Sequence, residues 1–288
     1  MRSLRYRNFV SDSERWDAFV ARDGDIVICT QPKCGTTWLQ RICSLLIFQT
    51  IELPAPLTAI SPWLDVLTAP VEQILSTLDA QTHRRFIKTH TPLDGLPFHP
   101  EVTYIGVGRD PRDVALSWDN HMLNMDFEVF FTARAAAVGT EGLEQMAAME
   151  VPADSELGRF RQWMDAEPPI DMMPTSLQGV LHHQQTLWAR RGEPNVVLLH
   201  YADLSADLDG QMRRLAAALG IAVDESVWPA LVHAATFGEM KRMAADLVPE
   251  STIGLFPEPD RFFNRGTSGA WRDIVTDEDR SHYDARVA

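Results

Sequence analysis

A short loop with a lysine, a glycine and two threonines follows the first apolar run of the chain and has the composition of an anion site. The segment Gln31–Trp38 is Gln-Pro-Lys-Cys-Gly-Thr-Thr-Trp. Free backbone N–H groups at the start of the next helix would point at an anion, with the threonine hydroxyls and Lys33 as further donors. The lysine precedes the glycine, so this is not a Walker A loop. An ordinary capped helix beside a surface lysine is the alternative interpretation.

Other polar residues stand at the ends of three further apolar runs. Lys88, Thr89 and His90 end the second run, Arg109 ends the third, and Tyr201 ends the fourth. The carboxyl ends of parallel strands lie along one edge of a sheet, which is where ligands bind in such folds. The sequence therefore predicts that lysine, histidine and arginine side chains converge at one edge.

The elements that must position these residues alternate along the chain. Runs rich in Val or Ile predict buried strands at Asp25–Thr30, Arg85–His90, Val102–Arg109 and Asn195–Tyr201. Helices are expected at Thr36–Gln49, from the capping pair Asp110-Pro111, at Ser176–Arg190, and at Asp209–Leu219 with Gly220 as its C-cap. Strands alternating with helices predict an α/β fold in three layers, with a central parallel sheet flanked by helices.

Two stretches lack clear periodicity. The stretch from about 122 to 174 mixes Ala, Met, Glu and Pro, and its prolines exclude a single helix across it. We expect it to form a helical lid over a pocket, within one domain that spans residues 1–288. Its aromatic residues suit either a lipophilic pocket or helix packing; they are Phe127, Phe130, Phe131, Phe160 and Trp163. The stretch from 249 to 269 is expected to be a loop.

Composition excludes several classes of protein. The chain has 288 residues, 45% hydrophobic and 23% charged, with a net charge of −14. Such a chain repels nucleic acid and anionic membranes, so an anion needs a local cluster of donors. Its three cysteines, Cys29, Cys34 and Cys43, predict neither a disulfide framework nor a zinc site. No signal peptide or membrane span is recognisable, which predicts a cytoplasmic protein.

Four segments, in this order along the chain, resemble motifs of the cytosolic-type sulfotransferases, which also have bacterial members. Pro32–Trp38 is similar to the family's 5′-phosphosulfate loop, and Lys88–His90 to its acceptor-site segment. Arg109–Ser117 resembles the 3′-phosphate motif, and Phe262–Trp271 the C-terminal phosphate loop. The resemblance implies a P-loop-like fold and transfer of a sulfuryl group from 3′-phosphoadenosine 5′-phosphosulfate (PAPS) to a hydroxyl of a small acceptor, without a metal.

The resemblance also implies catalytic roles for four residues. His90 would be the general base for the acceptor hydroxyl, which suits an imidazole. Lys33 would stabilise the leaving phosphate, and Lys88 would contact the sulfuryl oxygens. Ser117 would bind the 3′-phosphate with Arg109 and restrain Lys33 until the acceptor arrives. Taken singly, each residue has an ordinary structural alternative, such as a solvated lysine.

The cofactor-binding residues follow from the same motifs. They are Lys33, Cys34, Gly35, Thr36, Thr37, Trp38, Arg109, Ser117, Tyr201, Thr236, Phe237, Met240, Arg265 and Gly266. The chain departs from the family at Cys34, where serine is usual, at Asn264, where a cation is usual, and at Ala235, where threonine is usual. Arg261 is a candidate replacement for the missing cation.

Two rival functional classes remain, and the acceptor and the oligomeric state are open. A kinase-like ATP phosphotransferase would require magnesium and a Gly-Lys-Ser/Thr loop, which is absent. A binding protein without turnover would have lost Lys33 or His90. The acceptor is open, with Trp63, Trp118, His121 and Met122 as further pocket candidates. Arg272–Ser281 matches the family's dimer segment only at Thr276, so that form of dimer is not expected.

Overall fold

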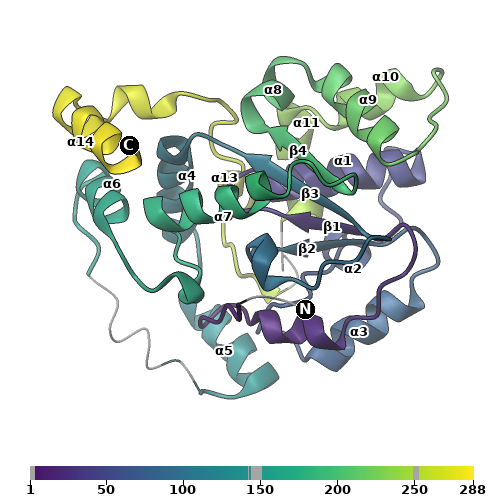
Figure 1. Ribbon diagram of the computed structural model, residues 1–288, viewed down its shortest axis with the longest axis horizontal. Helices are drawn as coiled ribbons and strands as arrows, with labels where there is room; N and C mark the ends of the chain where they lie inside the picture. Colours follow the sequence, from purple (N-terminus) through teal and green to yellow (C-terminus); the bar gives the residue numbers. More distant parts are fainter. Residues whose placement is uncertain (1–3, 142, 144–150, 249–252) are drawn as a thin grey trace.

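Four parallel strands form the sheet at the centre of the part of the chain described here (Figure 1). The computed structural model describes residues 4–141, 143, 151–248 and 253–288. The strands are β1 (Ile26–Cys29), β2 (Phe86–Thr89), β3 (Thr103–Gly108) and β4 (Val196–His200). Their order is β2-β1-β3-β4 and every pair is parallel, so each of the four predicted runs contains a strand of the predicted kind of sheet.

Helices connect and cover these strands. The α-helices are α1 (Thr36–Phe48), α2 (Leu57–Ile60), α3 (Val71–Ala80), α4 (Pro111–Leu123), α5 (Phe127–Val138), α6 (Glu156–Asp165), α7 (Leu177–Ala189), α8 (Tyr201–Ala206), α9 (Leu208–Ala218), α10 (Trp228–Ala234), α11 (Phe237–Arg242), α12 (Ala244–Leu247), α13 (Pro259–Phe262) and α14 (Asp277–Val287). Short 3₁₀ helices are η1 (Ser13–Ala18), η2 (Leu93–Gly95), η4 (Ile170–Met172) and η6 (Ala270–Asp273).

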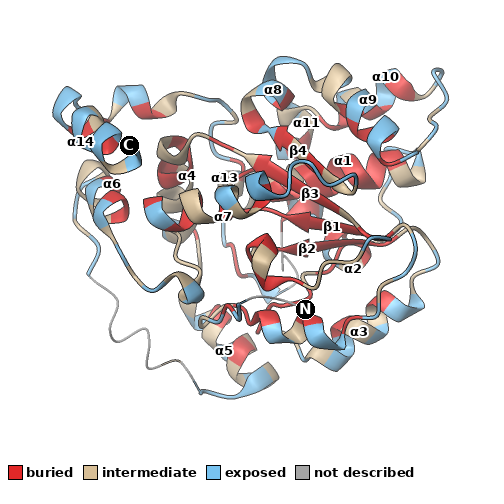
Figure 2. Cartoon of the chain, viewed as in Figure 1, coloured by how far each residue is buried: buried red, intermediate tan, exposed pale blue. Residues whose placement is uncertain are grey.

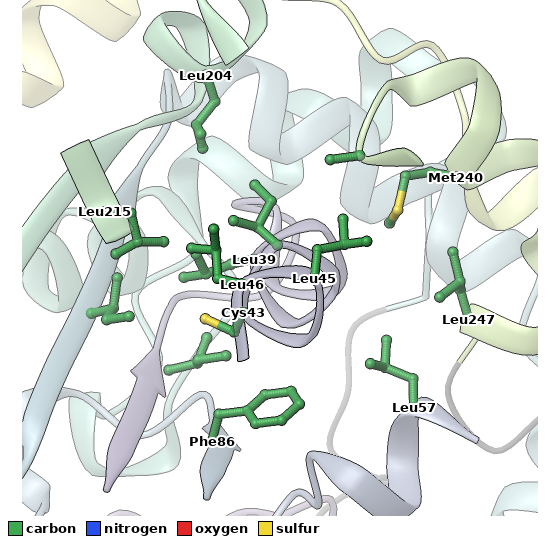
Figure 3. Packing of buried hydrophobic residues seen from close by; sticks show 14 of the residues in the cluster. Leu39, Cys43, Leu45, Leu46, Leu57, Phe86, Leu204, Leu215, Met240 and Leu247 are labelled. Atoms are coloured by element: carbon green, nitrogen blue, oxygen red, sulfur yellow. The ribbon is translucent and has the colours of Figure 1, made fainter. Parts of the chain in front are cut away.

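The sheet is buried on both faces, which explains why its strands are apolar throughout. Alternate residues of β1 enter different clusters: Ile26 and Ile28 pack with α1 and with α8 to α12, whereas Val27 and Cys29 pack with η1, α3 and α7. Figure 3 shows the first cluster, where side chains of α1 meet those of β2, α8, α9 and α11. Buried residues accordingly concentrate on the strands and α1 in Figure 2. The predicted three-layer fold is confirmed.

Local capping signals place the helices as expected. Asp110 caps α4, accepting a hydrogen bond from the N–H of Arg112, with Pro111 in the first helical position. Ser176 caps α7 through the N–H of Gly179. Gly220 follows α9 with φ +65°, a conformation that only glycine adopts without strain.

The stretch 122–174 contains separate helices, and its parts have different surroundings. α4 ends at Leu123, and α5, α6 and η4 follow; residues 142 and 144–150 of the expected lid lie outside the described residues. Phe160 and Trp163 of α6 pack in a core cluster with Trp271, so the pocket interpretation of these two aromatics is wrong. Residues 249–252 of the expected loop at 249–269 lie outside the described residues, and the rest of it includes the short helix α13.

The C-terminal segment is tied to the rest of the chain. The hydroxyl of Thr276 caps α14 in a reciprocal capping box with Asp279, so this residue has a role within the chain. Cys29, Cys34 and Cys43 are buried thiols without a disulfide. In the described part of the chain, no helix is both long and apolar enough to cross a bilayer.

Candidate active site

A cavity of about 470 Å³ opens at the carboxyl ends of the strands. It lies beside the loops that follow β1, β2 and β3, together with residues from α4 and the C-terminal segment. From the predicted site, the residues that line it are Lys33, Gly35, Thr36, Thr37, Trp38, Lys88, His90, Arg109, Ser117, Tyr201, Phe237, Met240, Arg265 and Gly266. The convergence expected from the sheet edge therefore occurs.

The loop after β1 leaves the start of α1 open toward the cavity. Gly35 is the N-cap of α1 with φ +94° and makes no side-chain capping hydrogen bond. A Cβ atom on Gly35 would come within 3.2 Å of the ring of Tyr201. Lys33 adopts φ +68°, which is unusual for a residue other than glycine, and its carbonyl accepts a hydrogen bond of 2.6 Å from Arg109. Gly35, Thr36 and Thr37 line the cavity, so an anion there would lie next to the first turn of α1.

The environment of Lys33 is cationic. Burial lowers the pKa of Lys33 to about 7, and the charges of Arg109 and Lys88 act in the same direction. Its Nζ lies 3.4 Å from Nδ1 of His121 and 4.5 Å from the ring centroid of Phe262. Among the described residues, no carboxylate forms an ion pair with this ammonium group. An anion in the cavity would stabilise the positive charge of Lys33.

His90 is held in the orientation that a general base requires. Its Nδ1 lies 2.7 Å from the carbonyl oxygen of Thr30, so the ring donates its proton there and leaves Nε2 with a free lone pair. Trp63 packs edge-on against the His90 ring, with 4.8 Å between centroids, and lies 4.2 Å from the Nζ of Lys88. Burial lowers the pKa of His90 well below its ordinary value, and Lys88 lowers it further. His90 is therefore neutral at pH 7.

Arg109, at the end of β3, contacts the loop that follows β1. Its guanidinium lies 4.2 Å from the centroid of the Tyr201 ring, at the start of α8. One nitrogen, Nε, is buried and has no hydrogen-bond partner among the described residues. A buried donor without a partner is costly unless a ligand accepts from it. Ser117 of α4 lines the same cavity, so the pair expected to bind a 3′-phosphate lies at one site.

Aromatic side chains of α1, α8 and α11 also line the cavity. Trp38 donates from its indole nitrogen to the carbonyl of Ala235 at 2.7 Å, which ties α1 to the residues before Phe237. The Trp38 and Tyr201 rings meet edge-on at 5.3 Å. The chain thus has flat apolar surfaces available for a base, and the backbone of Ala235 holds one of them in place.

The C-terminal loop supplies Arg265 and Gly266 but not Arg261. Arg261 donates to the side chain of Asn120 at 3.3 Å and pairs with Glu258 at 3.4 Å, and it does not line the cavity. The expectation that Arg261 replaces the missing cation is therefore not supported. Gly266 has φ +65°, and a Cβ atom there would lie 2.4 Å from the ring of Phe237.

Gly266→Ala is expected to weaken nucleotide binding because its methyl group would displace Phe237. Gly220→Ala is a matched control, since Gly220 has the same φ of +65° and open space around its Cβ position. Both variants should lose about 1 kcal/mol of stability from backbone strain. Calorimetric titration should show weaker nucleotide binding for Gly266→Ala alone; equal binding by the two variants would contradict the role of Gly266.

Two predicted cofactor residues do not line the cavity. The side chain of Cys34 is fully buried in the cluster of α4 and α6, and its N–H donates to the carbonyl of Gln31. The hydroxyl of Thr236 donates to the carbonyl of His233 and caps α11. A motif match locates a residue on a loop but does not give the direction of its side chain.

Sequence reasoning gave no role to Phe262, although it lies within the C-terminal motif. Its ring contacts both Lys33 and His121. In the sequence, the only sign of such a role was a pair of phenylalanines beside a loop that contains glycine. Among the described residues, no group of three or more His, Cys, Asp or Glu side chains could hold a metal ion.

A model of the sulfotransferase domain matches residues 23–288 of the chain. The chain belongs to the sulfotransferase family. This sulfotransferase is 43% identical to the glycolipid sulfotransferase of Mycobacterium tuberculosis, over 98% of this chain and 89% of that protein. It is also 26% identical to rat sulfotransferase 1A1, over 94% of this chain and 85% of that protein.

Solved structures share the fold of this sulfotransferase. Retinol dehydratase, in a complex with retinol and PAP, aligns with a TM-score of 0.71 and 20% identity, over 96% of this chain and 85% of that chain. A mouse sulfotransferase complexed with PAP gives a TM-score of 0.67 and 20% identity, over 95% of this chain and 85% of that chain. The likeness supports the P-loop-like α/β fold expected from the motifs.

Proposed function

We propose that this sulfotransferase transfers a sulfuryl group from PAPS to the hydroxyl of a lipophilic acceptor. The observation that carries the proposal is the gathering of Lys33, Lys88, Arg109 and His90 around one cavity. Three cations and a neutral histidine suit an anionic donor beside a hydroxyl acceptor. The family membership sets aside the kinase-like alternative and the binding protein without turnover.

The donor would fit the part of the cavity between α1 and the C-terminal loop. The open first turn of α1, with Lys33, Thr36 and Thr37, would bind the 5′-phosphosulfate. Arg109 and Ser117, with Arg265 and Gly266, would bind the 3′-phosphate, and the unpartnered Nε of Arg109 supports this. Trp38, Phe237 and Tyr201 would enclose the adenine, next to Met240.

The proposed reaction uses His90 and the two lysines. PAPS supplies the sulfuryl group. His90 takes the proton of the acceptor hydroxyl on Nε2 while the acceptor oxygen forms its bond to sulfur. Lys33 stabilises the electron pair that the phosphate oxygen keeps when the sulfur–oxygen bond breaks, and Lys88 neutralises the sulfuryl oxygens. No metal has a role in these steps.

The acceptor would contact apolar residues that line the cavity. These residues include Phe9, Trp63, Phe130, Met173 and Phe256. Relatives named glycolipid sulfotransferases support an acceptor with a lipid part. Met122, Phe130 and Met173, from both ends of the stretch 122–174, line the cavity, so we also propose this stretch as its lid.

Calorimetric titration without added metal tests the donor. We expect 3′-phosphoadenosine 5′-phosphate to bind more tightly than adenosine 5′-phosphate. Arg109→Ala should weaken binding of the bisphosphate by about tenfold or more, as a lost charged hydrogen bond does. Arg109→Ala also removes the hydrogen bond to the carbonyl of Lys33. Ser117→Ala is a second variant that tests the same phosphate site and leaves that hydrogen bond in place. Equal affinity of the wild-type protein for the two nucleotides would refute the proposed donor.

A further inference from the structure

The partner of Lys33 in this structure is a histidine of α4. Nζ of Lys33 lies 3.4 Å from Nδ1 of His121, in the part of the chain described. His121 is four residues after Ser117, so both lie on the same face of α4. The family resemblance assigns the restraint of Lys33 to Ser117, yet the hydrogen bond of Nζ goes to the residue one helical turn further on.

The His121 ring is fixed by aromatic neighbours. Its centroid lies 5.5 Å from that of Trp118, 4.9 Å from that of Phe256 and 5.8 Å from that of Phe262. Phe262 also lies beneath the Lys33 ammonium group. The ring therefore has little freedom to turn its Nδ1 away from Lys33.

His121 is a hydrogen-bond acceptor toward Lys33. Burial lowers the pKa of His121 well below its ordinary value, and the charges of Lys33 and Lys88 lower it further. A neutral imidazole with an accepting Nδ1 carries its proton on Nε2. The lysine ammonium can only donate, so the contact stabilises the charged form of Lys33.

The other groups near Lys33 either destabilise its positive charge or do not stabilise it. Arg109 at the end of β3 and Lys88 on β2 both lower the pKa of Lys33. His90, after β2, also lies close, since Lys33 lowers its pKa as well. His121 is the group among the described residues that accepts a hydrogen bond from Nζ.

We infer that His121 is a positioning residue that holds the Lys33 ammonium group in the donor-free enzyme and releases it when the donor binds. This role rests on the proposed function, in which Lys33 moves to the leaving phosphate oxygen. His121 keeps the lysine protonated and extended into the cavity among cations that would otherwise favour its neutral form. Ser117 is then free to bind phosphate.

The lysine content of the chain allows a direct test. The sequence contains three lysines, Lys33, Lys88 and Lys241, so protein labelled with ε-¹³C lysine gives three signals that single substitutions can assign. The chemical shift of the Lys33 signal, followed against pH without nucleotide, reports its protonation. His121→Phe keeps an aromatic ring in the cluster and removes the acceptor. We expect the Lys33 midpoint to fall by about one pH unit, as loss of a charged hydrogen bond does.

Two further variants separate positioning from packing. His121→Asn places an amide oxygen near the position of Nδ1 and should restore the wild-type midpoint. Ser117→Ala should leave the midpoint unchanged. An unchanged midpoint in His121→Phe, or a shift in Ser117→Ala alone, would overturn the role of His121. Thermal unfolding of each variant checks that it is folded.

Addition of 3′-phosphoadenosine 5′-phosphate completes the experiment. Once nucleotide is bound, the Lys33 midpoints of wild type and His121→Phe should coincide, because the nucleotide replaces His121 as the partner. A persistent difference at saturation would contradict release of Lys33. If the nucleotide does not bind to the wild type at all, the proposed function fails, while the donor-free titration still decides whether His121 holds Lys33.

Discussion

Lys33→Ala is expected to lower kcat for sulfuryl transfer by about 10²–10³-fold, the cost of removing one preorganised charge from a developing oxyanion. In the proposed role, the lysine acts on charge that grows in the transition state, so the variant should still bind the bisphosphate nucleotide. Initial rates with saturating donor and a lipophilic phenol or alcohol as acceptor measure kcat, and calorimetry measures binding.

Lys241→Ala is the matched control, because Lys241 is the third lysine of the chain and is exposed on α11. Its rate should equal that of the wild type. Full activity in Lys33→Ala would remove this residue from the mechanism. Burial lowers the pKa of Lys33 to about 7 in the free enzyme, and the proposed role requires the protonated form. The kcat/KM for the donor should therefore fall as pH rises through about 7.

His90→Ala should lower kcat by about 10³-fold with an alkyl alcohol as acceptor, within the range for loss of general base catalysis. The Nδ1 contact with Thr30 orients the free nitrogen that the proposed reaction uses, and an alanine offers no replacement. The pKa of His90 lies well below its ordinary value, so lowering the pH from 7 to 6.5 should not protonate it or reduce activity.

The acidity of the acceptor distinguishes a base from a structural residue. A nitrophenol that is ionised at the assay pH needs no base, so the defect of His90→Ala should shrink to less than about tenfold with that acceptor. His282→Ala removes an exposed histidine that contacts Asp165 and should behave like the wild type with both acceptors. An equal defect of His90→Ala with both acceptors would indicate a packing role.

The sheet and its loops could be predicted because short-range signals determine them. Continuous apolar runs such as Asp25–Thr30 indicate strands covered on both faces, and all four proved to be strands. Asp110 before Pro111 marked the start of α4 correctly. Polar residues at the strand ends then had to meet at one edge, whatever the details of packing.

Side-chain direction could not be predicted. Phe160 and Trp163 lie on a helix whose apolar face gives the same sequence pattern whether it meets a cavity or a core, and the structure packs them against the core. Cys34 occupies a motif position, but its side chain faces away from the cavity. The contact between Lys33 and His121 joins residues 88 positions apart, and only the folded chain brings them together.

The backbone of Lys33 has an energetic consequence for the whole fold. A residue with a Cβ atom at φ +68° costs about 1–2 kcal/mol relative to glycine, and a lysine rather than a glycine occupies this position. Selection for thermal stability alone would favour glycine there. Under the proposed function, the loop represents a trade-off between stability and activity at a single residue, with part of the free energy of folding retained as strain beside the proposed donor site.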